Sequence, residues 1–209
     1  MSDGPSGMRL DNVRLQDYST QLLKQLLALC HGTPGHLSVG ITGVHGGVGV
    51  STLAADLAIA AAGHHLGRVL LIDAHLQRPS LHTLFGTAAT PGLADILPVP
   101  TADLPTQATS IANLHFLPSG KQLELSGELH GRLDVFPDFL ASTSEEFPIV
   151  VADLPPVNIC SDFPALFHSL DGIVLVVEAK TTSRAAVSWA KQSSEKYGAT
   201  VLGIVFNKC

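Results

Sequence analysis

A chain of 209 residues has the length of a single domain that can bury a sizeable hydrophobic core. Its formal net charge of −6 argues against nucleic-acid binding, and its apolar stretches are too short to span a bilayer. The N-terminus is polar rather than signal-like, and the 3 cysteines (Cys30, Cys160, Cys209) are odd in number, which favours reduced thiols. We therefore expect a cytoplasmic protein that does not insert directly into a membrane.

In chain order, residues 1–14 are polar and glycine-rich and are expected to be disordered. Helical spacing of apolar residues over 15–30 predicts an amphipathic helix, after which strand and helix patterns alternate. The expected strands span residues 37–42, 68–72, 113–117, 147–152, 172–177 and 200–206. The expected helices span 51–63, a short part of 81–97, an irregular stretch over 123–142 with a kink or restart at Pro137, 162–169 and 184–197.

The central strands are continuous runs of β-branched and aliphatic residues, without the alternation of a half-exposed sheet. Such runs, separated by helices, predict a mostly parallel sheet with helices on both faces. The fold class is therefore α/β, a single doubly wound domain over residues 15–209.

The first strand leads into the sequence His45-Gly-Gly-Val-Gly-Val-Ser-Thr52, which opens an alanine-rich helix. Strand, glycine loop and helix together form a phosphate cradle, because backbone N–H groups turn inward and the helix N-terminus adds positive potential. Gly46, Gly47 and Gly49 are the expected cradle, and the Ser51 hydroxyl lies where such a loop binds Mg²⁺, with Thr52 beside it. A phosphate loop also has a lysine before this serine, and here that residue is Val50. The alternative is that the glycines make only a tight turn.

Two aspartates follow expected strands, Asp73 after residues 68–72 and Asp153 after residues 147–152. Ligands of doubly wound sheets bind at the carboxyl ends of the strands, so both carboxylates are candidates for chemistry around a metal ion. The alternative is that each carboxylate only accepts hydrogen bonds from neighbouring backbone amides.

The glycine loop, the run Val69-Leu-Leu-Ile-Asp-Ala-His-Leu-Gln-Arg-Pro-Ser80 and residues 81–97 together resemble the bacterial tyrosine kinases of capsule and exopolysaccharide assembly. Residues 114–120, 149–157, 171–177 and 201–207 fit the same family, so the resemblance covers about residues 15–209. The loop alone also resembles the related P-loop ATPases that partition chromosomes and position division sites.

This resemblance implies a P-loop NTPase-like domain over residues 15–209 and a role for each matching residue. Ser51 would bind Mg²⁺ with help from Asp153, and Asp73 would be the catalytic residue near the attacking tyrosine hydroxyl. Arg78 would lie near the phosphates or a neighbouring subunit, and Asn207 would lie near the base. The implied ligand is ATP or ADP with Mg²⁺.

The departures from the family pattern affect several parts of this machinery. The loop lysine is Val50, the second acidic residue after the second strand is His75, and the extra lysine of the partitioning relatives is His45. The ring-assembly motif of the early helix is replaced by Tyr18, Gln21 and Lys24, and the tyrosine-rich tail is missing. Losing a transition-state charge is costly for catalysis. We therefore expect a pseudokinase in which Asp73 is vestigial and for which no cofactor is expected, with ATP or ADP and Mg²⁺ as possible ligands if binding is retained.

The expected role is that of a regulatory or scaffolding subunit of exopolysaccharide assembly or secretion. It would dock to a membrane-bound polysaccharide co-polymerase or chain-length protein, which would recruit it to the inner membrane. It could also form a homo-oligomer. One alternative is an active but atypical tyrosine kinase or weak ATPase, since Ser51, Asp73 and Asp153 are intact. Another is a partitioning ATPase, which the negative charge and the lack of a C-terminal amphipathic helix disfavour.

Overall fold

The computed structural model describes residues 10–29, 36–64, 66–97, 104–121, 133–162 and 164–208, and the side chains of these residues except 10–16 and 160–162. The seven strands form one sheet in the order β3-β4-β2-β5-β1-β6-β7. All neighbours are parallel except β3 and β4, which confirms the mostly parallel α/β fold. Their bounds are β1 Leu37–Gly43, β2 Val69–Asp73, β3 Gln107–Ala108, β4 Leu114–Leu117, β5 Ile149–Asp153, β6 Gly172–Glu178 and β7 Val201–Asn207.

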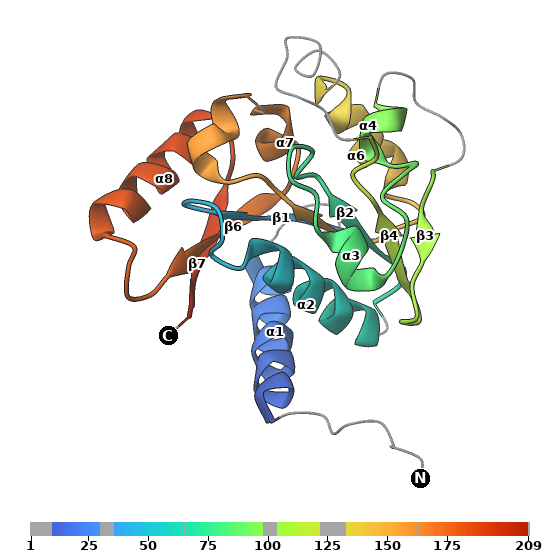
Figure 1. Cartoon of the computed structure of the whole chain (residues 1–209), viewed down its shortest axis with the longest axis horizontal. Helices are drawn as coiled ribbons and strands as arrows, with labels where there is room; N and C mark the ends of the chain where they lie inside the picture. The colour runs from blue at the N-terminus through green and yellow to red at the C-terminus, as the bar shows by residue number, and fades with distance from the viewer. Residues whose placement is uncertain are drawn as a thin grey trace.

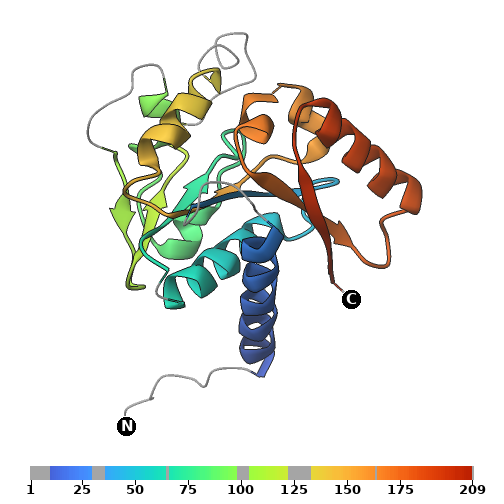
Figure 2. The same cartoon turned by 180° about the vertical axis from the view of Figure 1, so that it is seen from behind.

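Helices lie on both faces of this sheet (Figures 1 and 2). Their bounds are α1 Leu10–Leu29, α2 Val50–Gly63, α3 Leu81–Phe85, α4 Leu93–Ile96, α6 Phe136–Thr143, η1 Val157–Asp162 (a 3₁₀ helix), α7 Pro164–His168 and α8 Arg184–Lys196. Helix α2 packs on one face with α1 against it, and α6, α7 and α8 cover the other.

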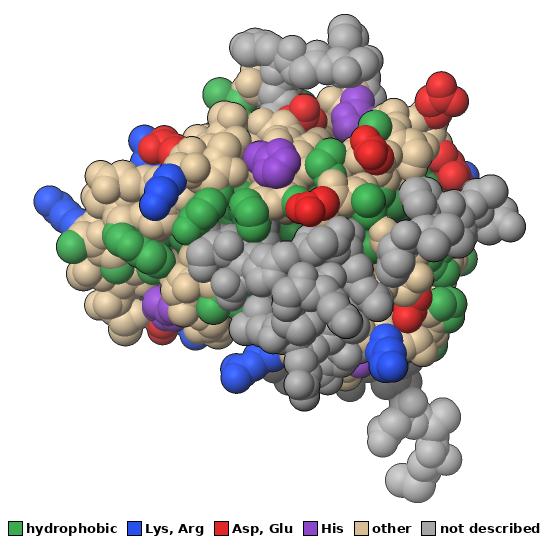
Figure 3. Space-filling view, turned by 90° about the horizontal axis from the view of Figure 1, so that it is seen from above, with side chains coloured by type: hydrophobic (Ala, Val, Ile, Leu, Met, Phe, Trp, Pro, Cys, Tyr) green, Lys and Arg blue, Asp and Glu red, His purple; other side chains and the backbone are tan. Residues whose placement is uncertain are grey.

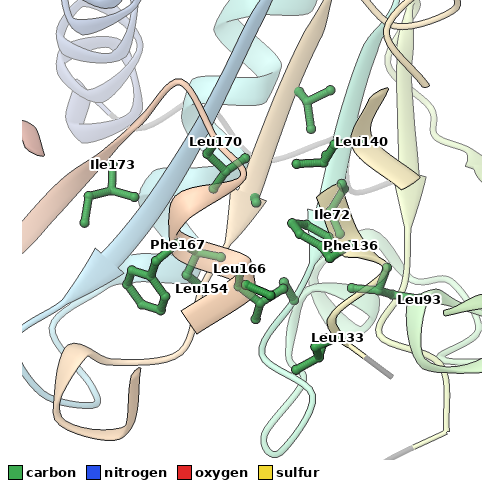
Figure 4. Packing of buried hydrophobic residues seen from close by; sticks show 14 of the residues in the cluster. Ile72, Leu93, Leu133, Phe136, Leu140, Leu154, Leu166, Phe167, Leu170 and Ile173 are labelled. Carbon is green, nitrogen blue, oxygen red and sulfur yellow. The ribbon is translucent and has the colours of Figure 1, made fainter. Parts of the chain in front are cut away.

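Two hydrophobic clusters separate these layers, because successive strand residues point to opposite faces. On the α2 side, buried alanines of α2 let the helix approach Val39 and Ile41 of β1 closely. On the other side, Phe136 and Phe167 pack with Ile72 and Leu154 (Figure 4). The strands β1, β2 and β5 are buried along their whole length, as continuous apolar runs in a parallel sheet require.

Several expected boundaries were wrong. Helix α1 begins at Leu10, so residues 10–14, expected to be disordered, are helical. Of the helix expected over 123–142, the described part is α6 from Phe136, with Pro137 in its first turn, which agrees with the expected restart and leaves no hydrogen bond unmade for lack of an N–H. The short helix expected over 162–169 is α7, preceded by the 3₁₀ helix η1. Strand β3 and helix α4 were not expected. Residues 1–9 and 122–132, Cys30 and Cys209 lie outside the described residues.

Candidate functional site: a glycine loop beside two buried aspartates

The glycine loop joins the end of β1 to the start of α2, as the sequence predicts. Gly47 and Gly49 have φ angles of 81° and 96°, which L-residues with a side chain rarely adopt. A Cβ atom added at Gly46 or Gly47 would meet no atom within 4 Å, so open space lies beside both residues. A Cβ atom at Gly49 would lie 2.3 Å from Nδ2 of Asn207, so a side chain at this position would displace the Asn207 amide.

Val50 is the first residue of α2 and occupies the lysine position of a phosphate loop. Its side chain is partly buried and packs against the apolar cluster on the α2 side of the sheet. One of its methyl groups lies close to Gly43, where an added Cβ atom would be 3.0 Å away. The Val50 side chain thus packs against the edge of the core and supplies no positive charge to the loop.

Asp73 ends β2 and is fully buried. Its carboxylate accepts hydrogen bonds from the backbone N–H groups of Ser80 at 3.0 Å, Leu81 at 3.1 Å and His75 at 3.3 Å. Burial raises the pKa of Asp73 to about 6, and these three N–H groups oppose the rise. Asp73 therefore has the structural role that the sequence left open, because it fixes the turn from β2 into α3.

Asp153 ends β5, directly opposite Asp73 in the parallel register of β2 and β5. Neither of its carboxylate oxygens has a hydrogen-bond partner among the described residues, although both are buried. Burial, and secondly the charge of Asp73, raise the pKa of Asp153 to about 8. The Ser51 hydroxyl is near enough to oppose this rise, but it does not meet the geometry of a hydrogen bond to either oxygen. A buried carboxylate without a hydrogen-bond partner lowers the stability of the fold, unless a bound ligand interacts with it.

These groups fit the metal end of a magnesium–nucleotide site. Ser51 is in the first turn of α2, and its Oγ accepts a hydrogen bond from Ser80 Oγ at 3.1 Å. Mg²⁺ is commonly held by one or two carboxylates together with a ligand's phosphates and water. No cluster of three His, Cys, Asp or Glu side chains within the described ranges can hold a metal ion alone. Ser51 and Asp153 would therefore hold the metal only together with a phosphate.

A cavity of about 670 Å³ adjoins the loop, a volume in the usual range for small-molecule sites. It is lined by Gly46, Gly47, Ser51, His75, Gln77, Arg78, Pro156, Asn158 and Ile159. Arg78 therefore lies on the cavity with the predicted cradle. Burial lowers the pKa of His75, which favours the neutral imidazole, so this residue replaces neither a carboxylate nor a lysine.

The other predicted ligand residues lie apart from this cavity. Gly49, Thr52 and Asn207 line a separate pocket of about 270 Å³ together with Tyr18, Leu53, Asp56, Val205 and Phe206. The Asn207 amide is already engaged, because its Nδ2 donates to the Val48 carbonyl at 2.8 Å. The residues predicted to bind a nucleotide thus lie in two pockets, one on the side of the loop that faces the 670 Å³ cavity and one on its more apolar side.

One residue at the loop was missed by sequence reasoning. Lys208 follows β7, and its Nζ donates to the Gly47 carbonyl at 2.9 Å. Nothing in the local sequence signals this contact, because it depends on how β7 aligns with β6 at the edge of the sheet.

The rest of the surface is relevant to the predictions about oligomer contacts, membrane insertion and nucleic-acid binding. Tyr18, Gln21 and Lys24 are exposed on the outer side of α1, where the ring-assembly motif of the family would lie. In the part of the chain that the structure describes, no helix has the length and apolar character needed to cross a bilayer. Among the described residues, the basic side chains on the face in Figure 3 are scattered between other side chains and do not gather in one large patch.

Comparison with known proteins decides the family. The sequence profile described as "ParA: NUBPL iron-transfer P-loop NTPase" matches residues 36–209. The tyrosine-protein kinase YwqD of Bacillus subtilis is 31% identical over 171 residues, which are 81% of this chain and 71% of that protein. The chain belongs to the bacterial tyrosine-kinase family of P-loop NTPases.

Solved structures agree with this family at the level of the fold. The crystal structure of the chimerical protein CapA2B2 matches with a TM-score of 0.81 and 24% identity, over 92% of this chain and 84% of that one. The septum site-determining protein MinD of Pyrococcus horikoshii OT3, solved with Mg-ADP, is more distant, with a TM-score of 0.65 and 20% identity over 80% of this chain and 68% of that one. The chain thus shares its fold with this septum site-determining protein.

Proposed function

We propose that this chain is a catalytically inactive, kinase-like regulatory or scaffolding subunit of exopolysaccharide assembly. The observation that carries the proposal is the placement of Val50. A valine packed against the core supplies no charge to a phosphate, and phosphoryl transfer depends on such charges. His75, neutral where the family has a second acidic residue, removes a further charge from the metal end of the site.

The role that remains is docking. The fold matches 98% of the solved VpsO kinase domain with a TM-score of 0.79, and a fold can be kept for its surface after its chemistry is lost. We place the partner in a membrane-bound polysaccharide co-polymerase or chain-length protein, which would recruit the chain from the cytoplasm to the inner membrane. The similarity to the putative tyrosine-protein kinase CapB of Staphylococcus aureus and to the chimerical protein CapA2B2 supports a partner of this kind by analogy.

An active but atypical kinase or weak ATPase is the second candidate. It is favoured by one observation, the orphaned carboxylate of Asp153 beside Ser51, which is the arrangement a metal–nucleotide complex would use. When bound, the metal would neutralise phosphate charge, while Ser51 and Asp153 would hold it and Asp73 would shape the adjacent turn.

Complementation separates the two candidates. In cells that lack the chromosomal copy, the wild-type chain and its Ser51→Ala variant are compared for polymer secretion, with the variant's expression and thermal unfolding checked first. A docking subunit predicts equal secretion, because Ser51 is exposed to the cavity and contributes little to the fold. Loss of secretion with a folded Ser51→Ala variant would contradict the proposal and support the enzyme.

A further inference from the structure

The two edges of the sheet differ in how well they are protected against pairing with another strand. One edge is β3, which has only 2 residues, Gln107–Ala108, and the other is β7, Val201–Asn207, which pairs with β6 alone. Natural proteins protect sheet edges with short strands, charged side chains, proline or bulges. The register shift of β7 lies at its start, and residues 203–207 contain neither a charge nor a proline. The β7 edge is therefore long, regular and unprotected.

The backbone of Ile204 faces the open side of β7. The N–H of Ala179, directly after β6, donates to the Asn207 carbonyl at 3.0 Å, so the backbone groups of Asn207 face the β6 side. Backbone direction alternates along a strand, so Val205 also faces β6, whereas Ile204 and Phe206 present their N–H and C=O groups to the open side. Within the described ranges, no helix, loop or further strand forms a hydrogen bond with the Ile204 backbone. This edge can therefore accept another strand through main-chain hydrogen bonds.

The side chains beside this edge are apolar and exposed. Ile204 is 37% exposed and Phe206 is 60% exposed, while Val205 between them is buried. Ile204 and Phe206 lie on the face of the sheet that α6, α7 and α8 cover, because their partners on β6, Leu175 and Val177, pack in the hydrophobic cluster of that side. In Figure 2, β7 runs along the front of the molecule, and no described helix or strand is drawn in front of it. A second strand at this edge would cover both exposed side chains.

We propose that β7 pairs antiparallel with β7 of a second copy of this chain, about a two-fold axis at Ile204, so that the two sheets join into one. Such a contact uses the same edge on both copies. Ile204 then lies opposite Ile204 of the second copy, and the two residues exchange both main-chain hydrogen bonds. Leu202 lies opposite Phe206 of the second copy, which brings apolar side chains together across the strands. The described lining of the 670 Å³ cavity contains no residue of β7, so the inference does not depend on what that cavity binds.

The charge pattern favours a second copy as the occupant of this edge. Residues 199–207 are uncharged, so self-pairing brings no like charges opposite one another. Lys208, the next residue, already pairs with Glu178 at 3.7 Å and would lie opposite Thr200 of the second copy. A charged segment of another protein would find no complementary charge along the strand. A single strand edge is smaller than the about 800 Å² per partner of a standard interface, so the dimer is expected to be weak and to form at micromolar concentrations or above.

Sedimentation velocity of the whole chain from about 1 µM to about 1 mM tests the proposal. The mean mass should rise from 21.9 kDa toward twice that value as the concentration increases. Ile204→Lys puts two positive charges opposite each other at the two-fold axis and should keep the chain monomeric over the whole range. Leu84→Lys on α3 is the matched control, because it adds the same charge to an exposed aliphatic side chain away from β7, and its dimerisation should stay within about twofold of wild type.

Hydrogen exchange locates the contact on the molecule. The Ile204 N–H faces solvent in the monomer and should exchange at least about tenfold more slowly at concentrations where the dimer forms. A mean mass of 21.9 kDa at every concentration, a dimer that persists in folded Ile204→Lys, or dimerisation without slower exchange at Ile204 would overturn the inference. If Ile204→Lys does not fold, Ile204→Pro replaces it, because proline is tolerated where the N–H faces outward and, lacking that N–H, should prevent dimerisation.

Discussion

Replacing Asp153 with asparagine should stabilise the protein, and increasingly so as the pH rises. Asp153 is fully buried at the end of β5, its oxygens have no hydrogen-bond partner among the described residues, and its pKa is raised to about 8 by burial and by Asp73. An acid with a raised pKa in the folded state holds its proton there while the unfolded chain has already lost it. The free energy of unfolding therefore falls as the pH rises from about 4 to about 8, and Asp153→Asn removes this loss.

The magnitude follows from the difference of one bound proton. Each pH unit inside this window costs about 1.36 kcal/mol, so between pH 5 and pH 8 the wild type should lose about 4 kcal/mol from Asp153 alone. The buried amide of the variant also lacks a partner, which costs about 1–3 kcal/mol at every pH. The variant is therefore expected to be close to wild type in stability near pH 5–6 and more stable by about 1–3 kcal/mol at pH 8.

Urea denaturation followed by circular dichroism at pH 5, 6, 7 and 8, without divalent cations, measures this effect. The quantity to compare is the change in free energy of unfolding with pH for wild type and for Asp153→Asn. Parallel pH profiles for the two proteins would refute the reasoning, because Asp153 would then titrate alike in the folded and unfolded chains.

Two further substitutions test the loop and the core. Gly49→Ala should destabilise by about 2–4 kcal/mol, since it adds a clash with Asn207 to the cost of a positive φ, whereas Gly47→Ala, with the same backbone cost and open space, should lose only about 1–2 kcal/mol. Equal losses in urea denaturation would show that the Asn207 contact is absent in solution. Phe136→Ala should cost about 3–5 kcal/mol because the ring is completely buried, while Leu84→Ala, whose side chain is 62% exposed, should change stability by less than about 1 kcal/mol. A thermal shift of the same size for both would contradict the described packing.

Much of the fold was predictable because its strands are continuous apolar runs. The pattern over β1, β2, β5 and β6 leaves little alternative to a buried parallel sheet, and the alanines of α2 indicate close packing on it. Short elements were missed because their stability comes from distant partners. Helix α4, for example, is held by its backbone N–H bonds to Pro118 and Ser119 and by the Asp95 carboxylate, which accepts from Gly92 at 2.9 Å.

The candidate site was predictable only where it depends on local sequence. The glycine loop and the two aspartates at strand ends are local signals, and the parallel register of β2 and β5 brings Asp73 and Asp153 side by side. The orphaned state of Asp153 and the reach of Lys208 to Gly47 were not predictable, since both depend on elements far apart in the chain. The roles expected of Arg78 and Asn207 toward a nucleotide stay predictions.

The most direct test of the central claim is a single-turnover phosphotransfer assay. The purified chain, in excess over γ-labelled ATP and with Mg²⁺, is incubated with a tyrosine-rich peptide, and both released phosphate and labelled tyrosine are measured beside a Val50→Lys, His75→Asp double variant. The account predicts no release or transfer above the protein-free background for the wild-type chain, since Val50 and His75 provide neither of the required charges. Transfer of label to tyrosine by the wild-type chain would contradict it and establish an active kinase.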